Sequence, residues 1–454
     1  MEIENQQIGD VDFSIEIVNH TLEDVVDIKR LVADFTYSED INKPFTSLRI
    51  VIADATGMAE LFPLVGDELV AIKFKSPNQV EYIQKLFKIN SIYARNIVQE
   101  RAHVYVIEAF SLEFFKNKTV SIGDSYKGML GSEIVQKVYD NFFKDTGYQE
   151  IGVFPKPLTV ENSTNLITIN SNTQSPINFL LQVAHYSENN QYKSSVYRFF
   201  EDKKGYNFKT INSMLRFDPV KDFYFGQTIA KSKENITPYQ LINGITFGRS
   251  FDMYDRLSKG LLDSSVDIID PITKTYVEKS FNYYDNFNDL THLDNFPILS
   301  NKTKYQGLDG SSSSNYVSAR YNNNEKYTDI VPYITERITA SNDPHLFHEN
   351  TRYNFLMQHK SQVQSLTSYT LDITVPGDTM LKSGDLINVF IPQNSKYENQ
   401  MQKYMLHFGQ QTSKFFVNAV KHQYIKNSGY FSTVLNVSKE SFNREVQVYD
   451  GGSK

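Results

Sequence analysis

One cluster of residues in this chain could carry metal chemistry. His345-Leu346-Phe347-His348-Glu349 brings two imidazoles and a carboxylate close together in the sequence. Zinc hydrolases of the His-Glu-x-x-His type place both histidines on one helical face with a glutamate between them. Here the glutamate follows both histidines, and the sequence suggests no third ligand. We therefore interpret the cluster as a solvated helix start and predict no metal ligands.

The other candidates for chemistry are isolated residues. His185 falls in a predicted helix and His422 in a predicted β segment, and both are interpreted as structural histidines. The pairs Glu23-Asp24 and Glu39-Asp40 fall in predicted loops, and a chain with 53 Asp and Glu offers such pairs by chance. There is no Gly-rich phosphate loop, Gly-x-Ser-x-Gly elbow or Walker motif. The sequence predicts no catalytic or cofactor-binding residues, no cofactor and no enzymatic activity.

The composition favours a multidomain chain without disulfides. A length of 454 residues exceeds what one core usually serves, so two to four domains are expected. The chain has no Cys, 32 Phe and 29 Tyr. A net charge of −7 argues against capture of nucleic acid through phosphate contacts. The polar N-terminus does not resemble a signal peptide, and no apolar run is long enough to span a membrane.

Two stretches of similar sequence organise the rest of the chain. Val65–Phe74 and Ser383–Pro392 each begin with a Gly-Asp turn and continue as a run rich in β-branched and aromatic residues. Glycine permits the tight turn, and aspartate can accept hydrogen bonds from nearby backbone. The runs that follow suit a half-buried strand.

The flanks of these stretches also match in order. The matching segments are Ser47–Asp54 with Leu371–Asp378, Phe87–Ile92 with Phe415–Val420, and Tyr105–Phe115 with Ser432–Phe442. Chance is the alternative explanation, because strands and turns draw on few residue types. The preserved order favours one β-rich unit used twice.

We expect a β-dominated α+β chain in which residues 1–115 form the first small antiparallel barrel. Its early strands are predicted at Phe13–Ile17 and Asp27–Phe35. Residues 116–242 are predicted to form a separate α+β domain. Helical periodicity runs over Ser132–Phe143. The second helix is capped by Ser175 and has Pro176 at its first position.

That second helix is predicted to bury Ile177, Leu180, Leu181 and Ala184. After it, the aromatic runs Tyr197–Phe200 and Tyr206–Phe208 flank Glu201-Asp202-Lys203-Lys204-Gly205, which predicts a hairpin.

Residues 243–285 and 363–442 are predicted to form the second barrel. Ile245–Phe251 and Tyr276–Tyr283 would be its opening strands. An insertion over 286–362 separates its two parts; we expect a mobile loop at Gly310–Ser314 and a helix after Asp343-Pro344. Residues 443–454 would be a tail.

The order of several short motifs makes the chain resemble a known family. The motifs are Pro63–Glu68, Ala109–Glu113 leading into Asn117–Val120, Gln174–Leu180 before the aromatic hairpin, Val375–Asp378 with Lys382–Asp385, and Val420–His422. In this order, from about residue 12 to 442, they resemble the baseplate hub protein of contractile-tailed phages of the T-even type. Related hubs occur in type VI secretion spikes and pyocin-like particles. The Asn-rich stretch 286–350 departs from the pattern.

The resemblance implies a structural role in the virion, in a tail baseplate assembled in the host cytoplasm. A homotrimer with two barrels per copy would present a pseudo-sixfold ring to the sixfold tail tube and a threefold face to the spike. The implied partners are further copies of the chain, the tail spike protein, tail tube or tube-initiator proteins, and tape measure and baseplate wedge proteins. The genome would pass through the lumen without sequence-specific binding, and an acidic lining would not retain it; a basic lining would contradict this last point. No membrane insertion is implied.

Two other functions stay open from the sequence. One is a hub-associated enzyme that degrades the cell wall, although no additional domain for it is visible. The other is a receptor-binding or carbohydrate-binding virion protein, because exposed aromatic side chains suit stacking on sugars. The even spread of Phe and Tyr along the strands favours cores over one binding patch.

Overall fold

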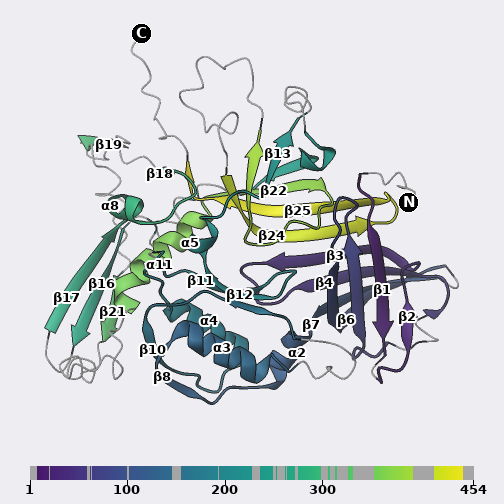
Figure 1. The fold of residues 1–454 in the computed structure, drawn as a ribbon, viewed down its shortest axis with the longest axis horizontal. Helices are drawn as coiled ribbons and strands as arrows, with labels where there is room; N and C mark the ends of the chain where they lie inside the picture. The colour runs from purple at the N-terminus through teal and green to yellow at the C-terminus, as the bar shows by residue number, and fades with distance from the viewer. Residues whose placement is uncertain are drawn as a thin grey trace, which may run out of the picture.

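The computed structural model describes residues 8–19, 21–58, 62, 64–99, 102–145, 155–192, 194–226, 236–248, 252, 261, 263–270, 275–297, 305–306, 312–313, 326–330, 352–391 and 414–442. A 14-stranded sheet runs through the chain and is accompanied by smaller sheets and a few helices (Figure 1). The fold is therefore β-dominated α+β, as the sequence predicts. Among the described residues, no helix is both long and apolar enough to cross a membrane.

The first unit of the large sheet comprises the N-terminal strands. These are β1 (Asp12–Val18), β2 (Val25–Asp27), β3 (Val32–Asp40), β4 (Ser47–Asp54), β5 (Leu69–Lys75), β6 (Ile83–Gln99) and β7 (Ala102–Ser111). They lie in the order β3-β4-β7-β6-β5-β1-β2 with antiparallel neighbours. The sheet curls, because Phe13 of β1 packs on Phe35 of β3 at a ring-centroid distance of 5.2 Å, although four strands separate β1 from β3 in the order. One apolar core fills the inside of this barrel-like unit.

The second unit is formed by strands from later in the chain. These are β13 (Lys221–Phe225), β14 (Leu241–Ile242), β15 (Gly244–Phe247), β22 (Tyr369–Pro376), β23 (Leu386–Phe390), β24 (Lys414–Ile425) and β25 (Tyr430–Lys439), with the short helix η2 (Pro238–Gln240) before β14. They pair in the order β15-β22-β25-β24-β23-β13-β14. Their inward side chains form a core of their own.

The two units repeat one topology. Reading from β3 in the first unit and β15 in the second, β3-β4-β7-β6-β5-β1 corresponds to β15-β22-β25-β24-β23-β13. The long hairpins β6–β7 and β24–β25 even share a bulge, between Ile89 and Ser91 in one and Val417 and Ala419 in the other. The duplication expected from the sequence is therefore confirmed by strand order. One difference is that β1 runs antiparallel to β5, whereas β13 runs parallel to β23.

Both Gly-Asp turns adopt a backbone that glycine favours. Gly66 has φ +93° and Gly384 has φ +87°, in the left-handed region. In the second unit, the Asp385 carboxylate accepts the Lys382 N–H at 3.1 Å. In the first unit, the corresponding group is Glu68, which accepts the Val65 N–H at 2.7 Å and the Gly66 N–H at 2.8 Å.

Asp67 therefore does not hold its turn in the way the sequence match suggests. It forms an ion pair with Lys88 of β6 instead. The structure aligns the second-unit Asp385 with Glu68, because the first unit has one more residue between its glycine and its strand.

A middle α+β region follows the first unit. Its elements are α2 (Leu112–Thr119), β8 (Ser125–Leu130), α3 (Gly131–Phe142), β9 (Leu158–Val160), β10 (Leu166–Asn170), α4 (Pro176–Tyr186), β11 (Tyr197–Glu201), β12 (Tyr206–Thr210) and α5 (Ile211–Met214). α3, α4 and the hairpin β11–β12 surround one aromatic-rich core. Both predicted helices and the predicted hairpin are confirmed.

Two local expectations about this region were wrong, and a third, the capping of α4, was met in position only. The predicted strand Tyr105–Phe115 ends at Ser111, because Leu112 begins α2. Ser175 is the N-cap of α4, but its side chain makes no capping bond; the Asn117 carboxamide oxygen of α2 accepts the Ile177 N–H at 2.8 Å instead. Leu181, predicted to be buried, is exposed, and Phe179 and Val183 are buried with the rest of the predicted face.

The remaining elements lie beside the middle region and the second unit. They are β16 (Asp263–Asp270), β17 (Thr275–Asn282), α8 (Tyr283–Asn286), η3 (Phe287–Asp289), β18 (Phe296–Pro297), β19 (Tyr305–Gln306), β20 (Ser312–Ser313), β21 (Lys326–Ile330), α11 (Arg352–Leu366) and β26 (Ser441–Phe442). Strand β17 pairs with β16 in a sheet with β21, so Tyr276–Tyr283 does not open the second unit as predicted. In contrast, β15 does belong to that unit, and β13 and β14 join it from residues before 243. The predicted boundaries 1–115, 116–242, 243–285 with 363–442, and 286–362 stay predictions.

Candidate functional site

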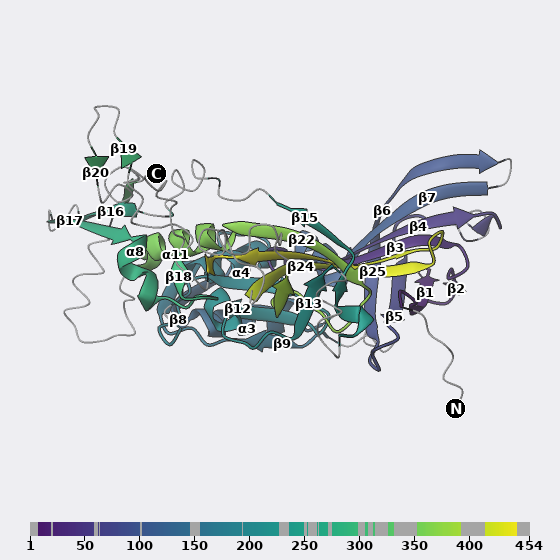
Figure 2. The ribbon, with the colours of Figure 1, turned by 90° about the horizontal axis from the view of Figure 1, so that it is seen from above.

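The two units are joined edge to edge by strands β24 and β3. Seven consecutive residue pairs form this antiparallel seam, from Ala419 opposite Asp40 to Ile425 opposite Asp34. Strand β24 thus leaves β23 at the shared bulge and continues against the first unit. The seam makes one continuous sheet of the two units (Figures 1 and 2).

The hairpin β24–β25 also completes the core of the first unit. His422 of β24 stacks on Tyr37 of β3, with ring centroids 6.1 Å apart and an interplanar angle of 11°. Phe431 of β25 belongs to the first unit's core, and Tyr424 packs against it. Burial lowers the pKa of His422 to about 3, so this histidine is neutral inside the barrel. Its Nδ1 bonds the Thr433 hydroxyl at 2.9 Å.

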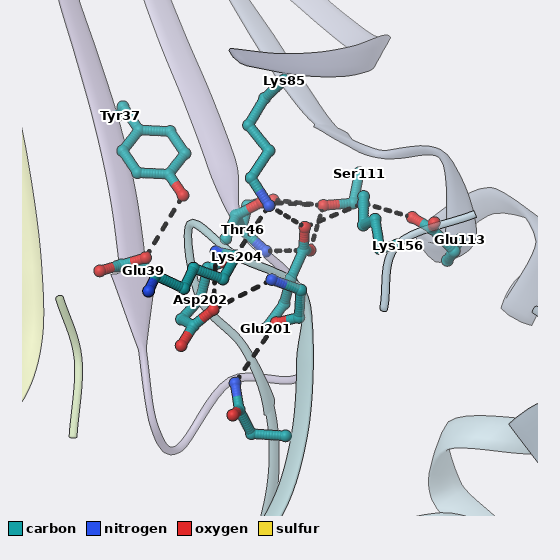
Figure 3. A network of polar contacts seen from close by, with 12 residues as sticks. Tyr37, Glu39, Thr46, Lys85, Ser111, Glu113, Lys156, Glu201, Asp202 and Lys204 are labelled. Atoms are coloured by element: carbon teal, nitrogen blue, oxygen red, sulfur yellow. Dashed lines mark hydrogen bonds and ion pairs between the residues drawn. The ribbon is translucent and has the colours of Figure 1, made fainter. Parts of the chain in front are cut away.

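The tip of the hairpin β11–β12 inserts between the two units. This tip is the segment Glu201–Gly205, and four of its five side chains are charged types. Glu201 and Asp202 are both buried, and Figure 3 shows the polar network around them. A charged turn is usually solvated, so its burial here requires partners on every side.

Glu201 binds the first unit. Its Oε1 lies 2.9 Å from Lys85 Nζ of β6, and its Oε2 accepts the Thr46 N–H at 3.0 Å and the Ser111 hydroxyl of β7 at 2.5 Å (Figure 3). Lys85 also donates to the Asp202 carbonyl oxygen at 2.9 Å. Lys85 occupies an inward-facing position of β6, between the core residues Ile83 and Phe87.

Lys156 extends the network towards the helices. Its Nζ lies 2.9 Å from Glu201 and 2.6 Å from Glu113 of α2. Burial alone would raise the pKa of Glu201, but Lys156 and Lys85 outweigh it and hold that pKa below its ordinary value. Burial alone would lower the pKa of Lys156, but the two carboxylates raise it. Glu201 and Lys156 are therefore both charged at neutral pH.

The next two residues of the tip bind the second unit. Asp202 pairs with Lys382 at 3.0 Å, just before the Gly384 turn. Lys203 donates to the Thr379 carbonyl oxygen at 2.7 Å and to that of Met380. Burial would raise the pKa of Asp202, but Lys382 and the backbone N–H groups of the turn lower it. One five-residue tip therefore contacts both units.

Glu39 lies beside the tip at the end of β3. Its carboxyl accepts the Ser383 N–H at 2.9 Å and the Tyr37 hydroxyl at 3.3 Å. Burial, followed by the negative charge of Asp202, raises the pKa of Glu39 to about 8. The predicted loop position of Glu39-Asp40 is wrong, because both residues belong to β3; Glu23-Asp24 does lie in a loop, between β1 and β2.

Two further contacts join the units directly. The hydroxyls of Ser76 and Thr379 lie 3.0 Å apart, and the Thr379 N–H donates to Ser76 Oγ at 3.0 Å. Together with the tip, these bonds fix how the second unit sits on the first. The arrangement therefore sets the angle between the two units.

The structure separates the histidines that the sequence singled out. His185 of α4 lies against His359 of α11, with ring centroids 4.9 Å apart. Burial, then His185, lowers the pKa of His359 to about 3. Across the described ranges, no group of three His, Asp or Glu side chains is placed to hold a metal ion. The cluster His345–Glu349 lies outside the described residues.

The fold can be compared with solved structures. No protein-family model matches the chain, and no curated protein matches it in sequence. The tail protein from Neisseria meningitidis MC58 has a TM-score of 0.52 and 11% identity, covering 95% of this chain and 99% of that one. The 43 kDa tail protein of prophage MuSo2 from Shewanella oneidensis has a TM-score of 0.50 and 9% identity, covering 94% and 99%. The chain therefore shares its fold, over nearly its whole length, with tail proteins, one of them from a prophage.

Proposed function

We propose that this chain is the structural baseplate hub of a contractile phage tail. Three copies would form a ring of six barrel units. The ring would meet the sixfold tail tube on one face and the threefold spike on the other. The function needs no cofactor and no catalytic step.

The observation that carries this proposal is the repeated unit joined edge to edge within one chain. A chain with two equivalent units and one β24–β3 seam already contains one third of a six-unit ring. Head-to-tail contacts that repeat the same rotation close into a ring. Three chains would provide three internal seams and three seams between copies, which supports a sixfold pattern built from threefold symmetry.

The buried tip of the hairpin β11–β12 supports the same proposal. Ring closure requires a constant angle at every junction, because a small error at each one accumulates around the ring. Glu201 and Asp202 each bind a different unit through paired charges at about hydrogen-bond distance. Buried, paired charges tolerate little displacement, since each charge that moves away leaves a partner unpaired in a poorly solvating interior.

The partners follow from the ring. The proposed ones are two further copies of the chain, the tail spike protein, and the tube or tube-initiator proteins, with tape measure and wedge proteins further away. Their place would be the baseplate of the virion tail, assembled in the host cytoplasm. The fold shared with the two tail proteins supports a tail component, and the hub position is our proposal.

Measurement of the mass of the purified full chain in solution tests the proposal. The expected result is a particle of three times the 52.4 kDa chain mass, with six lobes in cryo-electron microscopy averages. A monomer or a twofold dimer would overturn the hub. A monomer that binds glycans, or one that hydrolyses peptidoglycan, would support the receptor-binding or the cell-wall-degrading alternative instead.

A further inference from the structure

The internal seam has counterparts on two strand edges that are unpaired among the described strands. Strand β6 corresponds to β24: its first half pairs with β5, as β24 pairs with β23, and the bulge after Ile89 marks the same switch. Beyond that bulge β24 pairs with β3. In the part of the chain that the structure describes, the same stretch of β6 has no strand on that edge. Figure 2 shows the β6–β7 hairpin projecting away from the rest of the chain.

The partner that this stretch would need is also present. Strand β15 is the second unit's counterpart of β3, because it pairs with β22 as β3 pairs with β4. Strand β3 pairs with β24 on its other edge, whereas the described strands leave the other edge of β15 unpaired. Among the described strands, one copy of each half of the seam is therefore left unpaired.

Side chains are buried at the internal seam and exposed at its unpaired counterparts on β15 and β6. Tyr37 of β3 is fully buried under His422, whereas its counterpart Phe247 of β15 is 59% exposed. On the projecting hairpin, 44% of Tyr93, 71% of Ile97 and 62% of Val98 is exposed. Apolar side chains at an unpaired sheet edge mark a place where another strand adds.

We propose that the β6 edge of one copy pairs antiparallel with the β15 edge of the next copy, in the register of the internal seam. This inference rests on the proposed ring and names the strands that form it. The occupant is a second copy of this chain, because the chain's own β24–β3 seam provides the matching geometry.

The register can be read from the repeat. In the seam, Gln423 lies opposite Thr36 and Tyr424 opposite Phe35. When β6 and β24 are compared through their partners on β7 and β25, Asn96 corresponds to Gln423 and Ile97 corresponds to Tyr424. Strand β6 has one additional bulged residue between Tyr93 and Asn96. The same comparison can be made on the other side of the two units. Strand β7 corresponds to β25, so the residues of β4 that pair with β7 can be matched to the residues of β22 that pair with β25. Through these partners, Thr246 of β15 corresponds to Thr36 of β3, and Ile245 corresponds to Phe35. The expected pairs between copies are Asn96 with Thr246, and Ile97 with Ile245.

Because the chain contains no Cys, disulfides can be placed at will. Directly opposite residues of antiparallel strands have Cα atoms about 4.5 to 5.5 Å apart, which a disulfide can bridge. The test variant carries Asn96→Cys and Thr246→Cys. Both positions are exposed, so neither change removes core packing. Oxidation is followed by denaturing, non-reducing electrophoresis, and native mass is measured in parallel.

Matched controls come from the internal seam and from the single variants. A Gln423→Cys, Thr36→Cys chain places the same pair in the internal β24–β3 seam, where it should form a bridge within one chain. Asn96→Cys alone and Thr246→Cys alone should give no linked chains, because a head-to-tail contact does not bring a residue against its own copy.

Four outcomes are distinguishable. Linked dimers and trimers, with nothing larger, are expected and support the pairing. A trimer in solution that fails to cross-link overturns the β6–β15 pairing and leaves the proposed hub standing. Monomers that fail to cross-link overturn both. A ladder that extends beyond three chains supports the pairing but overturns the ring of three.

Discussion

Replacing Glu201 by glutamine should destabilise the junction strongly. Glu201 is fully buried and lies 2.9 Å from the Nζ atoms of both Lys85 and Lys156. The amide oxygen of glutamine can still accept the Thr46 N–H and the Ser111 hydroxyl, so the change removes mainly the charge. Lys156 keeps Glu113 as a partner, but in the part of the chain that the structure describes Lys85 loses the one carboxylate with which it forms an ion pair. Removing one partner of a buried pair typically costs about 3–5 kcal/mol.

Denaturant unfolding of the full chain measures this loss, followed by far-ultraviolet circular dichroism. Asp140→Asn is the matched control, because it also removes one carboxylate from a lysine pair. The Asp140–Lys144 pair is exposed, with a separation of 3.5 Å. An exposed helical pair of this spacing contributes only about 0.3–0.5 kcal/mol.

A second variant tests whether the cost comes from the unpaired lysine. In Lys85→Met with Glu201→Gln, the buried ammonium is gone, so the double variant should be more stable than Glu201→Gln alone. This sign of coupling is expected only if the two charges meet in the interior. If Glu201→Gln lowers the unfolding free energy by no more than Asp140→Asn does, the tip is solvated and our account of the junction fails.

Three further perturbations follow from the same structure. Because the pKa of Glu39 is raised to about 8 from 4.5, its contribution to stability is full below pH 4.5 and is lost as the pH rises through about 8; Glu39→Gln should therefore flatten the fall of the melting temperature between pH 4.5 and about 8, and an unchanged slope would contradict this. Phe247→Asp should abolish the trimer in mass measurements with the melting temperature of the monomer kept, since Phe247 is exposed; a trimer that survives would count against β15 as an interface. Gly384→Ala should cost more than Gly66→Ala in thermal unfolding, because both glycines have positive φ but only at Gly384 would a Cβ meet a side chain, Met214 Sδ at 3.0 Å; strain at positive φ alone costs about 1–2 kcal/mol. Equal losses would show that this contact is unimportant.

Much of the fold was predictable, because it depends on local patterns. Alternation of apolar residues located β1 and β4, helical periodicity located α3, and the aromatic runs around Glu201–Gly205 located the hairpin β11–β12. Order along the chain revealed the repeated unit. Register was less accessible: a Gly-Asp match pairs Asp67 with Asp385, whereas the hydrogen bonds pair Glu68 with Asp385. A one-residue difference in a turn is invisible when short motifs are aligned by identity.

The junction was missed because burial of a charged turn depends on contacts distant in sequence. Glu201–Gly205 has the composition of a solvated loop. The signal that could have located its partners lies in the strands. Glu39 and Lys85 both occupy inward positions of alternating strands, where an apolar residue is expected. A charge at such a position needs an opposite charge from elsewhere, and Asp202 and Glu201 are too distant in sequence for local patterns to indicate them.

The strands of the internal seam, β3 and β24, differ in sequence from their counterparts β15 and β6, and this difference has a physical reason. The internal seam forms as the chain folds, so it can bury large aromatic residues such as Phe35 and Tyr37 permanently. The edges proposed to meet between copies must remain soluble until a partner arrives. Strand β6 differs from β24 in this sense, because it has an additional bulge, a positive φ of 54° at Ala94, and the charged Arg95 on its exposed stretch. Bulges and charges are the usual protection of a sheet edge against wrong pairing. If this protection is the reason for the bulge, deleting Ala94 should increase aggregation of the monomer, whereas the matching deletion in the internal seam, of His422, should unfold the first unit.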